Sequence, residues 1–235
     1  MISSPARRHM ERALAAKAAA STAPDQLMDG TGIYEQMLLQ LANDRGRLKQ
    51  IQSTEGKAKL KADLLPAYDS YIEGVLEAGR GAADEVITTV MLWNIDAGRY
   101  PEALRVAAYA LQHDLPMPDR FERTTGCLVA EEVAEAALIA LRTRTEFDAA
   151  VIDQAIALTD GQDMPDQVRA KLLLARGRWV LRSANDENPP TEQQLIIAVE
   201  SLKRALTLHE ACGGKKDMEH AERFLKKHTA SQPTG

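Results

Sequence analysis

Apolar side chains recur along most of this chain every three or four residues, which is the spacing of one face of an α-helix. The region around residues 33–51 shows the pattern clearly. One side of its expected helix collects Tyr34, Met37, Leu38, Leu41, Leu48 and Ile51. No run of residues alternates convincingly between polar and apolar, as a half-buried β-strand does. The pattern therefore predicts an all-α, multi-helical protein of about ten helices.

Residues 92–118 predict two helices joined by a glycine corner. In the tetratricopeptide (TPR) repeat, a Gly-x-Tyr corner precedes small residues on the second helix. Those positions are filled here by Gly98, Tyr100, Ala103, Ala107 and Ala110. Alanines let two helices approach closely, so the stretch predicts a TPR-like hairpin, with ordinary helix packing as the alternative. A DNA-reading helix-turn-helix is disfavoured, because the second helix offers one arginine and little else to reach bases or phosphates.

A weaker copy of the same pattern lies closer to the C-terminus. Ala198, Leu202 and Ala205 supply its second helix, and Gly177 and Trp179 lie in the helix before it. Its corner is lengthened by an insertion. Together the two copies predict TPR-like helical hairpins in the central and C-terminal parts of the chain.

The composition agrees with a helical core. Hydrophobic residues make up 45% of the chain and aromatic residues only 4%, which favours helices over sheets. Cys127 and Cys212 are the only cysteines, too few for a disulfide framework or a cysteine-based zinc site. No stretch approaches 18 consecutive apolar residues, and the N-terminus lacks the apolar segment of a signal peptide. We expect a soluble protein of a reducing cytoplasm, without a membrane partner.

The net charge of −5 conceals an uneven distribution. Residues 1–65 carry ten Lys and Arg against seven acids, a net charge of +3, which leaves −8 for residues 66–235. A polyanionic partner would therefore meet the N-terminal third of the chain first.

Two groups of cations make that third a candidate for phosphate binding. The first group is Arg45, Arg47, Lys49, Lys57, Lys59 and Lys61. The second is Arg7, Arg8 and Arg12, on an N-terminal segment of the kind that follows a DNA groove. A solvated helix face and an ordinary soluble N-terminus are the alternatives. No aromatic residues are interleaved with these cations, so stacking on single-stranded bases is not indicated.

Signals for catalysis are weak. The five histidines form no HExxH motif. Asp160, Asp163 and Asp166 offer carboxylates for Mg²⁺, but an acidic helix start beside Pro165 explains them better. A solvated helix explains Glu131, Glu132 and Glu135 equally well. The chain has no phosphate-binding glycine loop, which excludes an ATPase.

Six segments of the chain, taken in order and with their spacing, resemble segments of a known protein family. They are residues 4–10, 34–44, 64–68, 74–98, 103–113 and 163–172. Between residue 4 and about residue 210 the chain resembles the small terminase subunit of P2-like tailed bacteriophages. The resemblance implies a role in packaging viral DNA in the cytoplasm of the bacterial host. In that family the small subunit recognises the cohesive-end site on concatemeric DNA and passes the DNA to a separate ATPase subunit.

The same resemblance assigns the DNA-recognition role to Arg7, Arg8 and the cations of residues 45–61. That family's subunit is commonly labelled the endonuclease subunit, but no nuclease motif is found here, so no catalytic residue is assigned. We expect four parts, listed with their roles: 1–32, a flexible basic arm and linker; 33–80, a helical region for DNA binding and oligomerisation; 81–229, a TPR-like helical-hairpin domain; and 230–235, a disordered tail. The long apolar side of residues 34–51, with the resemblance, predicts a ring-shaped homo-oligomer.

Three functions follow from these observations. The leading hypothesis is a DNA-packaging protein that binds double-stranded viral DNA at its packaging site and recruits the large ATPase subunit. The second is a magnesium-dependent endonuclease that cuts the site itself, and Mg²⁺ is expected as a cofactor only in that case. The third is a TPR-like adaptor that holds a peptide and binds no nucleic acid.

Overall fold

The computed structural model describes residues 4–24, 26–118, 123–182, 184 and 189–230. These residues form eleven α-helices and two short 3-10 helices without a β-strand, so the predicted all-α class is confirmed. The chain divides into two compact units, Met1–Thr125 and Gly126–Gly235. The first unit contains α1 (Pro5–Ser21), α2 (Gly32–Lys49), α3 (Thr54–Leu64), η1 (Leu65–Ala67), α4 (Asp69–Ala78), α5 (Glu85–Asp96) and α6 (Tyr100–Gln112). They are followed by α7 (Thr125–Thr143), α8 (Ala149–Thr159), α9 (Asp166–Leu181), α10 (Glu192–Leu208), η2 (Glu210–Cys212) and α11 (Lys215–Ala230).

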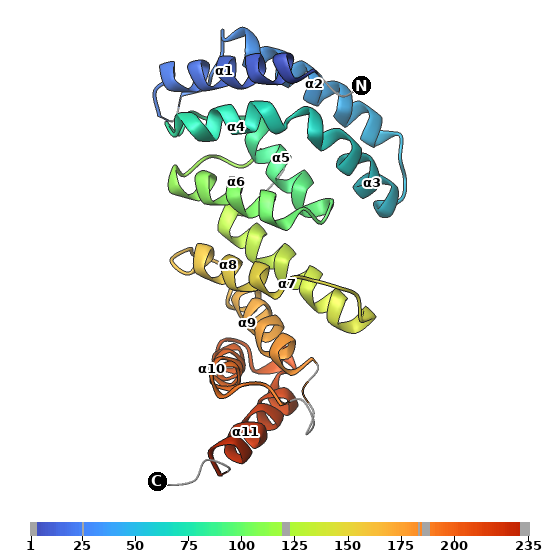
Figure 1. Ribbon diagram of the computed structural model, residues 1–235, viewed down its shortest axis with the longest axis vertical. Coiled ribbons are helices and arrows are strands. Elements are labelled where there is room, and N and C mark those ends of the chain that lie inside the picture. Colours follow the sequence, from blue (N-terminus) through green and yellow to red (C-terminus); the bar gives the residue numbers. More distant parts are fainter. Residues whose placement is uncertain (1–3, 25, 119–122, 183, 185–188, 231–235) are drawn as a thin grey trace. The chain divides into compact units, whose positions relative to one another are not determined.

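The N-terminal helix α1 is packed on the first unit, whereas we expected a flexible arm. It runs beside α4 (Figure 1) and buries Ala15 and Ala19 completely. Gly74 of α4 allows the close approach, because a Cβ there would lie 2.3 Å from the backbone oxygen of Arg12. A row of small residues facing a glycine therefore holds the segment in place.

The apolar side of α2 is buried within the first unit. Tyr34, Met37, Leu41 and Leu48 are at most 8% exposed, and α1, α3 and α5 all contact this helix. The predicted amphipathic helix is therefore confirmed. However, helices of the same chain bury this side of α2, so it is not available for contact with a second copy of the protein.

Helices α5 and α6 form a hairpin around the predicted glycine corner. Gly98 has a φ of +72°, in the left-handed region that a residue without a Cβ adopts readily. Ala103, Ala107 and Ala110 on α6 are at most 1% exposed, and α6 packs against α5. The corner and the buried alanines are confirmed, while the relation to TPR repeats stays a prediction.

In the second unit, α10 packs between α9 and α11. Gly177 of α9 faces α10 so closely that a Cβ would lie 2.4 Å from Cγ of Leu202. Ala198, Leu202 and Ala205 of α10 are fully buried in this core. The helix pairing expected from the weaker copy is therefore present, and its likeness to a TPR repeat is likewise untested.

The expected part boundaries do not coincide with the two units. The junctions at 32/33 and 80/81 both fall inside the first unit, where α1 contacts α4 and α2 contacts α5 across them. Of the expected tail, Ala230 ends α11, and residues 231–235 lie outside the described part of the chain. Within the described residues, no helix combines the length and the apolar character needed to cross a membrane.

Candidate nucleic-acid interface

Two expected cations lie in the first turn of α1. Ser4 caps this helix by accepting a hydrogen bond from the backbone nitrogen of Arg7 at 3.3 Å. Nε of Arg7 lies 2.8 Å from Oε1 of Glu11, yet the Arg7 side chain stays 60% exposed. Arg8 is exposed and forms no ion pair with the other described residues. The Glu11 side chain is only 11% exposed, so a phosphate that drew Arg7 away would leave a largely buried carboxylate without its partner.

Arg12, the third cation of the N-terminal segment, is engaged within the unit. Its Nε lies 2.9 Å from Oε2 of Glu77, and its NH1 nitrogen lies 3.4 Å from Oε2 of Glu73. The hydrogen bond to Glu77 is the main reason that the pKa of Arg12 is raised. Arg12 therefore ties α1 to α4.

Arg45 and Lys61 are held by residues of α5. The guanidinium of Arg45 lies 2.7 Å from Glu85 and donates a hydrogen bond to Oγ1 of Thr89 at 2.8 Å. Nζ of Lys61 lies 2.5 Å from Oδ2 of Asp96, and the Lys61 side chain is only 16% exposed. These two cations brace α2 and α3 against α5, so neither can bind a phosphate without breaking its ion pair.

The other members of the cluster are more accessible. Arg47 lies 3.0 Å from Asp44 on its own helix and remains 58% exposed. Lys49 at the end of α2 and Lys59 on α3 are exposed, and Lys57 is partly buried. The three lysines form no ion pair with any residue in the described ranges. A cation in the last turn of α2 also complements the helix dipole, so Lys49 has a structural role as well.

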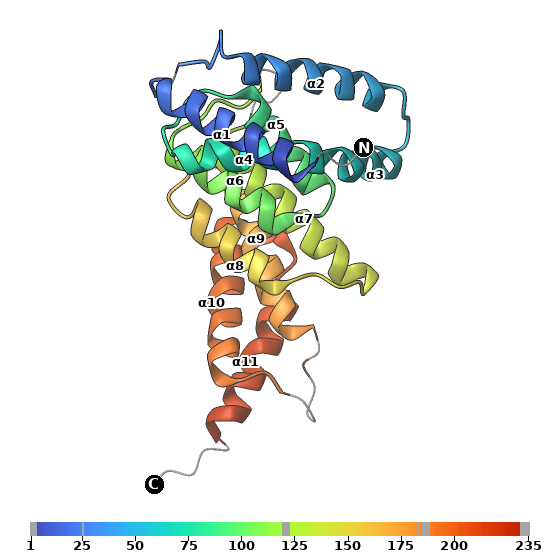
Figure 2. The same cartoon turned by 45° about the horizontal axis from the view of Figure 1, so that its top comes forward.

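The structure thus separates the eight expected residues by accessibility. Four of them can contact a ligand without breaking an ion pair: Arg8, Lys49, Lys57 and Lys59. Two are exposed but form ion pairs on their own helices, namely Arg7 and Arg47. The last two, Arg45 and Lys61, form ion pairs with residues of α5. Figure 2 shows α3 following the C-terminal end of α2 on one side of the first unit. Of the eight residues predicted from the sequence, four are therefore accessible to a ligand without the loss of an ion pair.

A buried carboxylate fixes the start of α5. Oδ1 of Asp84 accepts hydrogen bonds from the backbone nitrogens of Val86 at 2.8 Å and Ile87 at 3.1 Å. Oδ2 accepts a third from the Tyr71 hydroxyl at 2.7 Å. Burial raises the pKa of Asp84 to about 6 and raises the pKa of Tyr71 well above its usual range. Asp84 is thus a helix cap whose two carboxylate oxygens both accept hydrogen bonds from protein groups.

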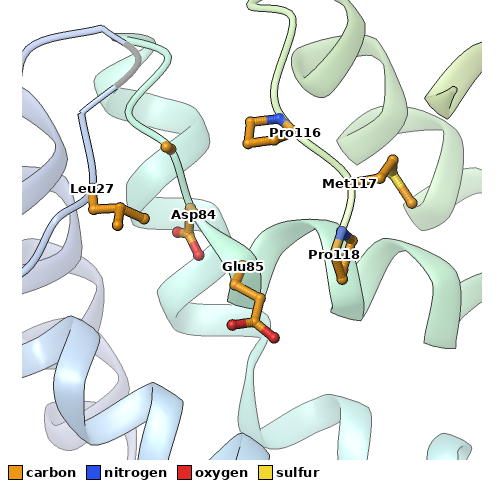
Figure 3. Close-up of a pocket in the computed structure, with 7 residues that line it drawn as sticks. Leu27, Asp84, Glu85, Pro116, Met117 and Pro118 are labelled. Carbon is orange, nitrogen blue, oxygen red and sulfur yellow. The ribbon is translucent and has the colours of Figure 1, made fainter. Parts of the chain in front are cut away.

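A cavity of about 460 Å³ opens beside this cap (Figure 3). Its lining consists of Leu27, Ala83, Asp84, Glu85, Pro116, Met117 and Pro118. Figure 3 shows the two acids near Leu27, with the two prolines and Met117 on a separate segment. Among the described residues that line it there is no cation. The cavity consequently lacks the charge needed to hold a phosphate.

The acidic residues considered for magnesium do not form a site. Asp160, Asp163 and Asp166 are all exposed, and Asp166 opens α9 as expected for a helix start. Glu135 pairs with Lys171. In the part of the chain that the structure describes, no three His, Cys, Asp or Glu residues come together as a metal site.

Sequence reasoning passed over a second group of cations, on α11. Its exposed members are Lys215, Lys216, Arg223, Lys226 and Lys227. The acidic net charge of residues 66–235 concealed them, because an average over many residues hides one basic helix face. A helical projection of residues 215–230 alone is the signal that would have found them.

Comparison with known proteins gives two matches. The family model described as the phage small terminase subunit matches residues 38–167. A curated relative from Escherichia phage P2, "Terminase, endonuclease subunit", is 41% identical over 232 residues, which cover 99% of this chain and 90% of the relative. No solved structure matches this chain.

Proposed function

The chain belongs to the phage small terminase subunit family, and on that premise we propose that it binds double-stranded viral DNA during packaging. The resemblance stated from six short segments is confirmed by a match over nearly the whole chain. In this proposal the protein recognises the cohesive-end packaging site in the host cytoplasm. It then recruits the large ATPase subunit, since the chain carries no phosphate-binding glycine loop of its own.

The observation that carries the proposal is the set of accessible cations in the first unit. Lys49 and Lys59 are exposed, and neither forms an ion pair within the described part of the chain. Arg8 is exposed in the same way on α1. Phosphate contacts of this kind supply the sequence-independent part of DNA affinity and release counterions on binding.

Self-association belongs to the same proposal, but through another surface than the one expected. Met10 and Leu14, one helical turn apart on α1, are 57% and 43% exposed, and Leu39 on α2 is 66% exposed. Met10 and Leu14, four residues apart on α1, share one side of that helix, and in this proposal they contact another copy in a ring. The double change Met10→Ser with Leu14→Ser should lower the mass measured by light scattering. A parent that is already a monomer near 26 kDa (the chain is 25.8 kDa) would contradict self-association.

The test of DNA binding compares two variants that lose equal charge. Lys49→Gln with Lys59→Gln removes two unpaired cations, whereas Arg45→Gln with Lys61→Gln removes two that are held by α5. The slope of log K against log salt changes by about 0.9 per phosphate contact. We expect the first variant to flatten the slope by roughly 2, with only a small fall in melting temperature from the loss of Lys49 at the end of α2. The second should keep the parent slope and melt earlier.

Two results would contradict this assignment. If the Lys49 and Lys59 variant keeps the parent slope, these lysines form a solvated face only. If both variants flatten the slope equally, net charge rather than a defined contact face governs binding.

A second candidate function is cleavage of the packaging site. It is favoured by the name of the P2 relative, an endonuclease subunit, at 41% identity. Magnesium would be the metal, but the exposed Asp160, Asp163 and Asp166 do not converge, so no residue is assigned to it. Incubating the purified chain with site-containing duplex and Mg²⁺, without the ATPase subunit, tests this directly. Nicked product would support it, and intact DNA would contradict it.

A further inference from the structure

The outward face of α11 is rich in exposed cations. The helix docks through Ala221 and Phe224, which are at most 9% exposed, with Met218 packed beside them on the core. On the opposite face the exposed cations are Lys215, Lys216, Arg223, Lys226 and Lys227. The helix thus packs on the core through one face and exposes five cations on the other, over about four turns.

The acids of α11 do little to neutralise this face. Asp217 lies 2.8 Å from Nε of Arg178 on α9, a partly buried pair that faces the body of the unit. Glu219 is exposed and Glu222 is partly buried, so two carboxylates accompany the five cations. Lys227 lies over the Phe224 ring at 5.8 Å, which orients one cation without removing its charge.

We propose that this α11 face is the DNA contact of the second unit, an inference that rests on the proposed function. Lys216, Arg223 and Lys227 occupy positions i, i+7 and i+11, which recur on one side of a helix. At a rise of 1.5 Å per residue they span about 16 Å. Along duplex DNA that distance covers roughly five base pairs, each with a phosphate on either strand. Lys216, Arg223 and Lys227 are therefore spaced so that all three can contact phosphates along one edge of a DNA groove.

Double-stranded DNA suits the face better than a single strand does. Phe224, the one Phe, Tyr or Trp residue of α11, is 9% exposed and packs on the core, and the His220 ring lies against it at 4.8 Å between ring centroids, so no exposed ring offers a platform for stacking on unpaired bases. Cations on a rigid helix, without exposed aromatic residues, fit phosphates spaced along a duplex.

Division of the DNA contact between two units has a consequence for affinity. The first unit offers Arg8, Lys49 and Lys59, and the second offers the α11 face. Two contacts joined by one chain raise each other's effective concentration. Weak individual contacts therefore combine, and loss of either one should weaken binding to every DNA sequence alike.

The experiment uses the full-length chain and a labelled duplex at several salt concentrations. Lys216→Gln with Arg223→Gln removes two cations of the face, and the matched control is Arg105→Gln with Arg142→Gln, which are exposed on α6 and α7. We expect the α11 variant to flatten the salt slope by roughly 2 and to bind about thirtyfold more weakly at 0.15 M salt. The control should keep the parent slope.

Each outcome separates this inference from the proposed function. A parent without salt-dependent DNA binding overturns the proposed function, and this inference with it. A parent that binds, beside an α11 variant with unchanged slope, overturns only the α11 contact. An α11 variant that keeps the slope but no longer retains the large subunit would show that the face serves an acidic protein instead. Lys215→Gln with Lys226→Gln, on the same face, repeats the test should the first variant fold poorly.

Discussion

Replacing Gly74 with alanine tests whether α1 is docked on α4 as closely as the structure shows. Gly74 lies inside α4, where alanine instead of glycine ordinarily stabilises a helix by about 1 kcal/mol. Helix propensity alone therefore predicts a more stable protein. The packing of α1 predicts the opposite sign.

The size of the effect follows from what the new methyl group would meet. It would lie 2.3 Å from the backbone oxygen of Arg12, 2.8 Å from Cβ of Ala15 and 3.0 Å from the backbone nitrogen of Ala16. Two of these atoms belong to the backbone and the third to an alanine, so no side-chain rotation relieves the overlap. Overpacking of a core costs about 1–3 kcal/mol, and α1 must shift as a whole. After subtraction of the gain in propensity, we expect a net loss of up to about 2 kcal/mol.

The assay must report on the first unit alone. The chain has two tryptophans, Trp93 in the first unit and Trp179 in the second. In a Trp179→Phe background, urea unfolding followed by tryptophan fluorescence monitors Trp93, which is 3% exposed in α5. A lower urea midpoint for Gly74→Ala is the expected result.

Gly46→Ala is the matched control. Gly46 lies inside α2, and a Cβ there would meet nothing within 4 Å. It should therefore stabilise the first unit by up to about 1 kcal/mol. If Gly74→Ala raises the urea midpoint as Gly46→Ala does, α1 does not dock closely on α4 and the reasoning is refuted.

Two other predictions concern the first unit. Ala107→Leu should overpack the seam between α5 and α6 and lower its stability by about 1–3 kcal/mol, read as a lower melting temperature; an unchanged one would count against the pairing. Burial raises the pKa of Asp84 to about 6 from an unfolded value of 3.8, so the folded state binds a proton in that window that the unfolded state lacks. The stability that this proton contributes is full below the unfolded pKa and is lost as the pH rises through about 6. Relative to Asp84→Asn, the parent should therefore gain urea resistance between pH 7 and pH 4, and parallel pH profiles of the two would contradict this.

Local patterns in the sequence predicted the elements well. The glycine corner at Gly98 and the buried alanines of α6 were predicted, because both depend on residues close together in the chain. The apolar side of α2 was also predicted, but the helices that pack against it were not. Periodicity shows that a face is buried without showing which chain buries it, and here α1, α3 and α5 do so.

The candidate site was less predictable, because its charges depend on distant partners. Arg45 pairs with Glu85 and Lys61 with Asp96, contacts that no local spacing reveals. The docking of α1 depends on Gly74, some sixty residues away in the chain, which in the sequence is an ordinary helix glycine. Net charge over long segments likewise concealed the α11 face. In each case the sequence did not show which distant residues come into contact in the fold.

The most direct test of the central claim is the affinity of the unmodified chain for a duplex that carries the packaging site, measured between about 50 and 200 mM salt. With Arg8, Lys49, Lys57 and Lys59 on phosphates, log K should fall linearly with log salt, with a slope of about −3.6 or steeper. Absence of binding at the lowest salt, or an affinity that does not change with salt, would contradict the account.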